Sequence, residues 1–115
     1  MKTDRELLEL AAKAAGLHIK ADRIDADDRF THFVIGAKNT RERTNWNPLT
    51  DDGDALRLAV NLGIAPIQDK KDNVCAAYWT DVRCCHVGYN SDPIAATRRA
   101  IVRAAAEIQL HREKA

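Results

Sequence analysis

The chain of 115 residues lacks most of the motifs by which enzyme classes are recognised. It has no glycine-rich phosphate loop, no nucleophile elbow, no zinc ribbon and no pair of histidines at metal spacing. Only three cysteines occur, two of them adjacent, so the sequence predicts no disulfide framework and favours a reducing, cytoplasmic compartment. No apolar run approaches the roughly 18 residues that span a bilayer. The N-terminus is charged from its second residue, so we expect neither a signal peptide nor contact with a membrane.

An excess of charge of one sign is also lacking. Lysine and arginine number 18 and aspartate and glutamate 17, which gives a formal net charge of +1. The overall charge therefore argues neither for nor against nucleic acid as a partner. The signs are nevertheless distributed unevenly: residues 98 to 103 hold three arginines and no acid, and residues 51 to 54 hold three aspartates and no base.

The order of predicted elements indicates the fold class. Helical signals and strand-like segments alternate as α-β-β-α-β-β-α, without a repeat or a low-complexity linker. This order predicts one α+β domain over residues 1–115, with a small, mostly antiparallel sheet of about four strands packed by three helices. A chain of this length and 45% apolar composition can bury a modest core without disulfides.

Capping signals place the three helices. Thr3 and Glu6 have the spacing of a capping box, and Gly16 is typical of a helix end. The middle helix should begin at Thr50 or Asp51 and end at Gly63. The last helix should begin with Asp92 as the cap and proline at the first helical position.

Apolar patterns predict which helix faces are buried. The middle helix has apolar residues nearly all round, so we expect it to be buried on more than one side, in the core or at a subunit interface of a homo-oligomer. Ile94, Ile101 and Ile108 lie seven residues apart and should form one seam of the core along the last helix.

Strand signals are weaker. A short strand is expected near residues 17–19, and a clearer one over residues 30–37, which are rich in aromatic and β-branched residues. Residues 38–48 have no periodicity and are interpreted as a loop. "IAPIQ" is expected to be a short or edge strand, because Pro66 cannot donate to a ladder. "VCAAYWT" and "VRCCHVGY" predict a hairpin around Thr80 and Asp81.

The stretch "NWNPLTDDGD", residues 45–54, admits three interpretations. In a structural one, Trp46 fills the core, Asn47 makes a turn and an aspartate caps the helix. The surplus carboxylates of Asp51, Asp52 and Asp54 could instead bind a divalent cation or pair with the arginines of the last helix. In the third interpretation the stretch belongs to a ligand pocket, with Trp46 stacking on a base and Asn47 reading its edge.

The arginine cluster also has two interpretations. Arg98, Arg99 and Arg103 could form a solvated face. Arg99 and Arg103 lie one turn apart, however, and could together hold a phosphate through forked donors. Three arginines are few for duplex DNA, but they are enough for one nucleotide or dinucleotide.

The cysteines and the remaining aromatics give less definite signals. Strand alternation should direct Cys84 and Cys85 to opposite faces, so they cannot easily share one metal, and all three cysteines are interpreted as small buried apolar residues. A cysteine nucleophile paired with His86 or His32 is conceivable, but no spacing places them together. Trp79 and Tyr89 lie at the edges of predicted strands, where they could be core, rim or ligand contacts.

Three helical segments carry a family resemblance. "TDRELLELAAKAAG", "WNPLTDDGDALRLAV" and "DPIAATRRAIVRAAAEI" resemble a family of small phage and prophage proteins, which is in turn distantly similar to the NinX proteins of lambdoid phages. The resemblance covers somewhat under half of the chain. It implies a phage origin and an accessory role in the host cytoplasm, and it implies no reaction.

Two functional hypotheses follow, with a third in reserve. The first is a non-catalytic counter-defence protein that sequesters a small nucleotide-type signal of host immunity. The alternative is a protein that binds a host protein or nucleic acid, and the weaker third is a metal-dependent nuclease or hydrolase. For the first hypothesis, the candidate ligand-binding residues are Trp46, Asn47, Asp51, Asp54, Trp79, Tyr89, Arg98, Arg99 and Arg103.

Overall fold

The chain folds as an α+β protein, as the element order predicts. A computed structural model describes residues 2–21, 33–35 and 44–114. Its helices are α1 (Asp4–Ala14), α2 (Asp52–Leu62) and α3 (Pro93–Lys114). All the described strand pairs are antiparallel.

The helix ends lie where the capping signals predict. The Thr3 hydroxyl accepts the backbone N–H of Glu6, and Asp51 caps α2 by accepting the N–H groups of Gly53 and Asp54. At the start of α3, the Asp92 carboxylate accepts the N–H of Ala95 at 3.0 Å. Gly16 and Gly63 adopt left-handed conformations, with φ of 74° and 69°, as helix C-termini require.

The strands differ from the prediction in number and grouping. The described residues contain six strands in two three-stranded sheets, not about four in one sheet. The first sheet has the order β1 (Ile19–Ala21), β2 (Phe33–Ile35), β3 (Thr44–Trp46). Strand β3 lies within the segment predicted to be a loop, because a strand of three residues is too short to show periodicity. The strand predicted near residues 17–19 begins instead at Ile19.

The second sheet has the order β4 (Ala65–Asp69), β5 (Val74–Tyr78), β6 (Cys84–Gly88). The predicted hairpin is confirmed: Tyr78 pairs with Cys84 across the turn, and the Thr80 hydroxyl accepts the N–H groups of Val82 and Arg83. The predicted strand over residues 30–37 lies partly outside the described residues, as does His32.

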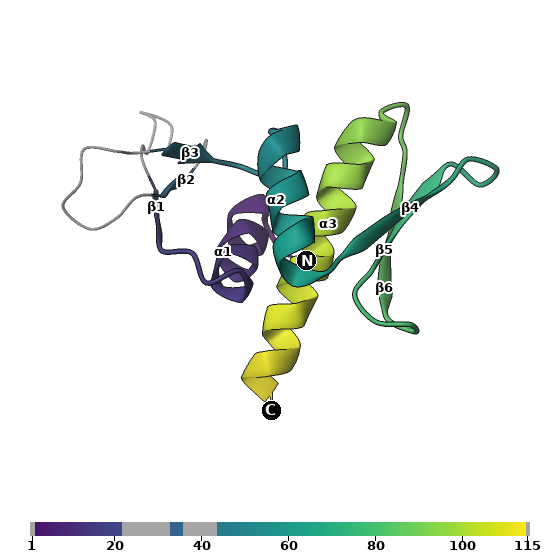
Figure 1. The fold of residues 1–115 in the computed structure, drawn as a ribbon. Helices are drawn as coiled ribbons and strands as arrows, with labels where there is room; N and C mark the ends of the chain where they lie inside the picture. Colours follow the sequence, from purple (N-terminus) through teal and green to yellow (C-terminus); the bar gives the residue numbers. More distant parts are fainter. Residues whose placement is uncertain (1, 22–32, 36–43, 115) are drawn as a thin grey trace.

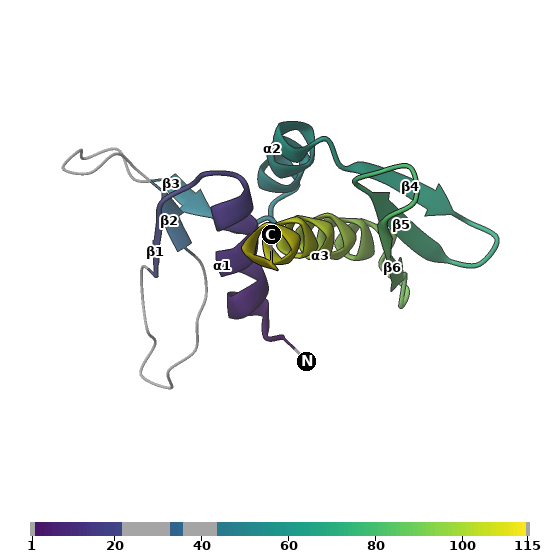
Figure 2. The same cartoon turned by 90° about the horizontal axis from the view of Figure 1, so that it is seen from below.

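The three helices lie between the two sheets (Figures 1 and 2). Alanines with no exposed surface, Ala11 and Ala12 on α1 and Ala100, Ala104 and Ala105 on α3, belong to the core where these two helices pack together. Small side chains allow helix backbones to approach closely. Helix α3 also packs on β5 and β6, so that it contributes to the core on more than one side.

One prediction about buried faces is wrong and another is not tested by a single chain. On α2, Leu56 is 64% and Val60 75% exposed, so the chain itself covers one side of this helix, and burial of the other side at a subunit interface stays a prediction. Ile94 does not join the core seam of Ile101, since it is 60% exposed although Ala96 in the same turn of α3 is buried. No helix in the described ranges is long and apolar enough to cross a membrane.

Candidate functional site

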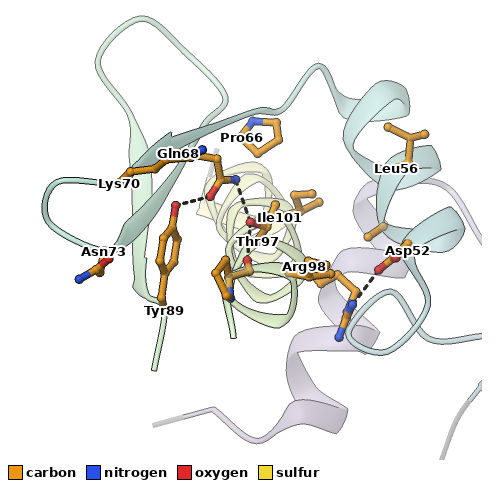
Figure 3. Close-up of a pocket in the computed structure, with 13 residues that line it drawn as sticks. Asp52, Leu56, Pro66, Gln68, Lys70, Asn73, Tyr89, Thr97, Arg98 and Ile101 are labelled. Carbon is orange, nitrogen blue, oxygen red and sulfur yellow. Dashed lines mark hydrogen bonds and ion pairs between the residues drawn. The ribbon is translucent and has the colours of Figure 1, made fainter. Parts of the chain in front are cut away.

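A groove runs between α2, β4 and the first half of α3 (Figure 3). Its volume is about 670 Å³. The walls are mainly apolar and are formed by Ala55, Leu56, Pro66, Pro93, Ile94 and Ile101. Pro66 and Gln68 reach the groove because alternation along β4 directs both side chains to the same face. Exposed apolar side chains around a concave surface are the usual lining of a binding site.

A chain of hydrogen bonds crosses the groove on its β4 side (Figure 3). The Tyr89 hydroxyl donates to Gln68 Oε1 at 2.5 Å, and Gln68 Nε2 donates to Thr97 Oγ1 at 2.8 Å. Thr97 in turn donates to the backbone carbonyl of Pro93 at 2.7 Å. Desolvation raises the pKa of Tyr89 above its ordinary value, with smaller contributions from Cys75 and Asp69. The phenol therefore stays protonated and remains a donor at neutral pH.

Charged side chains stand at both ends of the groove. At the α2 end, Arg98 donates from Nη1 to Asp52 Oδ1 at 2.7 Å and from Nε to the backbone carbonyl of Leu49 at 2.7 Å. Among the residues that the structure describes, no partner is found for its Nη2. At the opposite end, Lys70 lines the groove beside the β4–β5 turn and forms no ion pair with any residue in the described ranges.

The residues from the end of β3 to the first turn of α2 make contacts that stabilise the fold. Trp46 is 3% exposed and belongs to the core. Asn47 makes the turn before the helix, with its side-chain oxygen accepting the N–H of Leu49 at 3.0 Å. Asp54 is buried and accepts the N–H of Asn47 at 3.0 Å and Nη2 of Arg57 at 2.7 Å. With Asp51 as the cap, these four residues lie outside the lining of the groove.

The three aspartates face different partners. Asp51 caps the helix, Asp52 pairs with Arg98 and Asp54 pairs with Arg57. The interpretation in which acids pair with arginines of the last helix is therefore correct for Asp52. Within the described ranges, no group of three or more His, Cys, Asp or Glu side chains is placed to hold a metal ion.

The three arginines diverge instead of converging on one ligand. Arg98 borders the groove, Arg99 pairs with Asp4 of α1 at 2.9 Å, and Arg103 donates to the backbone carbonyl of His86 at 3.4 Å. Arg99 and Arg103 lie one helical turn apart, but their guanidinium groups bind different elements: Arg99 binds α1 and Arg103 binds β6. Of the nine candidate residues, only Arg98 and Tyr89 line the groove.

A second, smaller cavity of about 380 Å³ lies between β6 and α3. Its lining includes Trp79, Arg83, Cys84, Cys85 and His86. Cys75 is buried as predicted, but Cys84 and Cys85 are only partly buried. Desolvation raises the pKa of Cys85; Arg103 opposes this shift, while Glu107 and Cys84 add to it.

Sequence reasoning missed Leu56, Gln68, Lys70 and Thr97, the residues that give the groove its walls and polar groups. Gln68 follows Pro66 by two residues in a strand, a spacing that places both on one face. That signal was available, but nothing in the sequence showed that this face of β4 lies opposite α2.

Comparisons with protein-family models, curated proteins and solved structures gave no match to this chain.

Proposed function

We propose that the chain is a non-catalytic binding protein and that the groove between α2, β4 and α3 holds a small nucleotide-type molecule. The observation that carries this proposal is the groove itself. Its volume of about 670 Å³ falls within the roughly 300–1,000 Å³ typical of small-molecule sites. Mainly apolar walls with a few placed polar groups suit a flat heterocycle better than a sugar or a polyanion.

The hydrogen-bond chain favours a base with an amino group. Gln68 Nε2 directs its hydrogens to Thr97 Oγ1 at 2.8 Å and to Cys75 Sγ at 3.6 Å. Gln68 Oε1 accepts one bond from Tyr89 and has a second lone pair. The polar side of the groove therefore offers acceptors, which complement an exocyclic amino group such as that of adenine.

Lys70 supplies the charge that a phosphate needs. Lys70 lines the groove directly after the end of β4, two residues beyond Gln68. A base at Gln68 would place an attached phosphate within reach of Lys70, and Arg98 Nη2 offers a second donor at the α2 end. In the phage setting that the sequence resemblance implies, such a protein would sequester a nucleotide signal of host immunity without altering it.

A thermal-shift panel tests the proposal. Purified protein is heated with mono-, di- and cyclic nucleotides, and a ligand at 100 times its Kd should add about 2.7 kcal/mol of stability. AMP should shift Tm more than IMP, which replaces the amino group by a carbonyl. A panel in which no nucleotide raises Tm would refute the proposal.

Two neighbouring lysines provide a matched pair of variants. Lys70 lines the groove and Lys71 does not, although both are exposed. Lys70→Ala should weaken binding about tenfold, equivalent to about 1.4 kcal/mol, and Lys71→Ala should leave it unchanged. Equal effects of the two changes would show that the phosphate is attracted by general charge and not held in the groove.

A second candidate function is recognition of a partner protein. Val60 lies one turn beyond Leu56 on α2 and is 75% exposed, so the apolar surface continues past the groove. Exposed apolar patches that exceed a small-molecule site are typical of protein interfaces. Val60→Lys should abolish capture of such a partner and leave nucleotide binding intact, which separates the two functions.

A further inference from the structure

Strand β6 lies at an edge of the second sheet, and the alternation of backbone hydrogen bonds shows which of its groups point outward. Arg83 and Tyr89, which flank β6, form backbone hydrogen bonds of 3.1 and 2.8 Å to the residues that flank β5. Such bonds involve every second residue of an antiparallel pair, so alternate residues between these two face β5. The other residues of the strand, Cys84, His86 and Gly88, therefore direct their N–H and C=O groups away from β5.

This outward side of β6 is open to a further strand. Figure 2 shows β6 at the outer side of the sheet, and no described strand pairs with it there. Arg103 Nη1 donates to the outward carbonyl of His86 at 3.4 Å, which is long for a charged donor. A carbonyl oxygen has two lone pairs, so this one can accept another hydrogen bond. The edge thus offers donors and acceptors at alternate residues.

The opposite edge of the same sheet is blocked. Ala77 of β5 is paired with Cys85 and directs its backbone groups toward β6. Pro66, which lies opposite Ala77 on β4, is therefore at a position whose backbone groups point outward. Proline has no N–H and prevents regular pairing with a further strand. Strand β6 contains no proline, lysine or arginine, so of the two edges only that of β6 accepts another strand.

Gly88 has no explanation within the described part of its own chain. Its φ is not positive, and a Cβ at this position would meet no described atom within 4 Å. Glycine weakens a strand, and it often marks a place where another backbone approaches closely. A second strand beside β6 would account for this residue.

We propose that β6 pairs with β6 of a second copy of the chain, antiparallel and around a two-fold axis at His86. This register pairs all three outward positions, since His86 lies opposite the partner's His86 and Cys84 lies opposite the partner's Gly88. The two second sheets then join into one continuous sheet, and both copies use the same surface, as two-fold symmetry requires. The interface lies apart from the groove between α2, β4 and α3, so it does not depend on nucleotide binding.

The distribution of charge favours a second copy as the occupant. Residues 84–91 hold no Asp, Glu, Lys or Arg, although 30% of the chain is charged. The strand therefore does not repel its own copy and offers no complement to a charged partner. Antiparallel pairing also brings the end of β6 at Arg83 beside the partner's end that leads to Asp92. Both residues are exposed, and their opposite charges attract across the interface.

Sedimentation equilibrium of the full chain tests the pairing. The wild type should dimerise at concentrations up to about 1 mM, because an interface below the standard size binds weakly. His86→Pro removes an outward N–H and no bond to β5, so circular dichroism should show a folded chain while the dimer Kd rises about tenfold or more. His86→Ala removes the same side chain, retains the N–H and should dimerise as the wild type does. A monomeric wild type, or equal Kd values for the two variants, would overturn the proposal.

Gly88→Cys tests the register. The introduced thiol should lie opposite the partner's Cys84 with Cα atoms about 5.5 Å apart, a separation that disulfides span. Within one chain, positions 84 and 88 are about 14 Å apart along the strand, so mild oxidation can link them only between copies. Ile67→Cys places a thiol on the same sheet face, 54% exposed in the wild type but on β4, and controls for chance collision. Equal yields of linked dimer from the two variants would refute the pairing.

Discussion

Asp54 of α2 accepts the backbone N–H of Asn47 through Oδ2 at 3.0 Å, and this bond joins the second helix to the turn that follows β3. The carboxylate is almost wholly enclosed, since only 5% of its side-chain surface is accessible. Trp46, the residue before Asn47, lies in the core. The bond therefore sets the position of α2 relative to the first sheet.

Asp54→Ala should lower the free energy of unfolding by about 1–3 kcal/mol, because the N–H of the half-buried Asn47 loses its acceptor. Asp54→Asn should lower the free energy of unfolding by a smaller amount, since the amide oxygen can still accept the N–H of Asn47. Arg57→Ala removes only a partner that is 73% exposed and should cost less than about 1 kcal/mol. Urea unfolding measures all three. Equal losses for Asp54→Ala and Arg57→Ala would show that the ion pair, and not the Asn47 contact, is what stabilises the chain.

Arg98 and Arg99 are adjacent in sequence but should differ in their effect on stability. The Arg98 side chain is 18% exposed and holds both Asp52 and the Leu49 carbonyl. Arg98→Ala should lower the free energy of unfolding by about 1–3 kcal/mol. Arg99 is 41% exposed and pairs with an exposed Asp4, so Arg99→Ala should cost less than about 1 kcal/mol. Chemical denaturation distinguishes them, and the reverse order would contradict the packing described for α3.

Local signals in the sequence were sufficient to predict where the three helices begin. Thr3, Asp51 and Asp92 act through side chains that contact amides within three residues, so the caps could be predicted without tertiary information. The exposure of Leu56 and Val60 could not be predicted in this way. An apolar residue on a helix has the same local signal whether or not another element covers it.

The candidate site could be predicted only in part for the same reason. Tyr89 and Arg98 were selected for their chemistry, and both border the groove. Gln68 and Thr97 are ordinary polar residues whose importance depends on a contact between positions 29 residues apart in sequence. Arg99 and Arg103 share a helix spacing, but their partners on α1 and β6 are set by tertiary packing.

Trp46 should behave as a core residue and not as a stacking platform for a base. Trp46→Ala should lower the free energy of unfolding by about 3–5 kcal/mol, as deletion of a buried indole does. Trp46→Phe retains most of the apolar volume and should cost less. Any loss of ligand binding in Trp46→Ala should follow the fraction of unfolded protein, as measured by circular dichroism under the binding conditions. Lost binding in a fully folded variant would instead place the indole in the ligand site.

Tyr78 reports the charge of Cys84. The Cys84 thiolate, chiefly by repulsion and also through a hydrogen bond, raises the pKa of the Tyr78 phenol above its ordinary value. Cys84→Ser removes the ionisable sulfur, so the pKa of Tyr78 should fall toward the ordinary value. The chain has two tyrosines, and a Tyr89→Phe background isolates Tyr78 in an ultraviolet titration of the phenolate band. Cys85→Ser, on the opposite side of β6, should leave the titration unchanged. If Cys84→Ser left it unchanged as well, the sulfur would be too distant from the phenol to act on it.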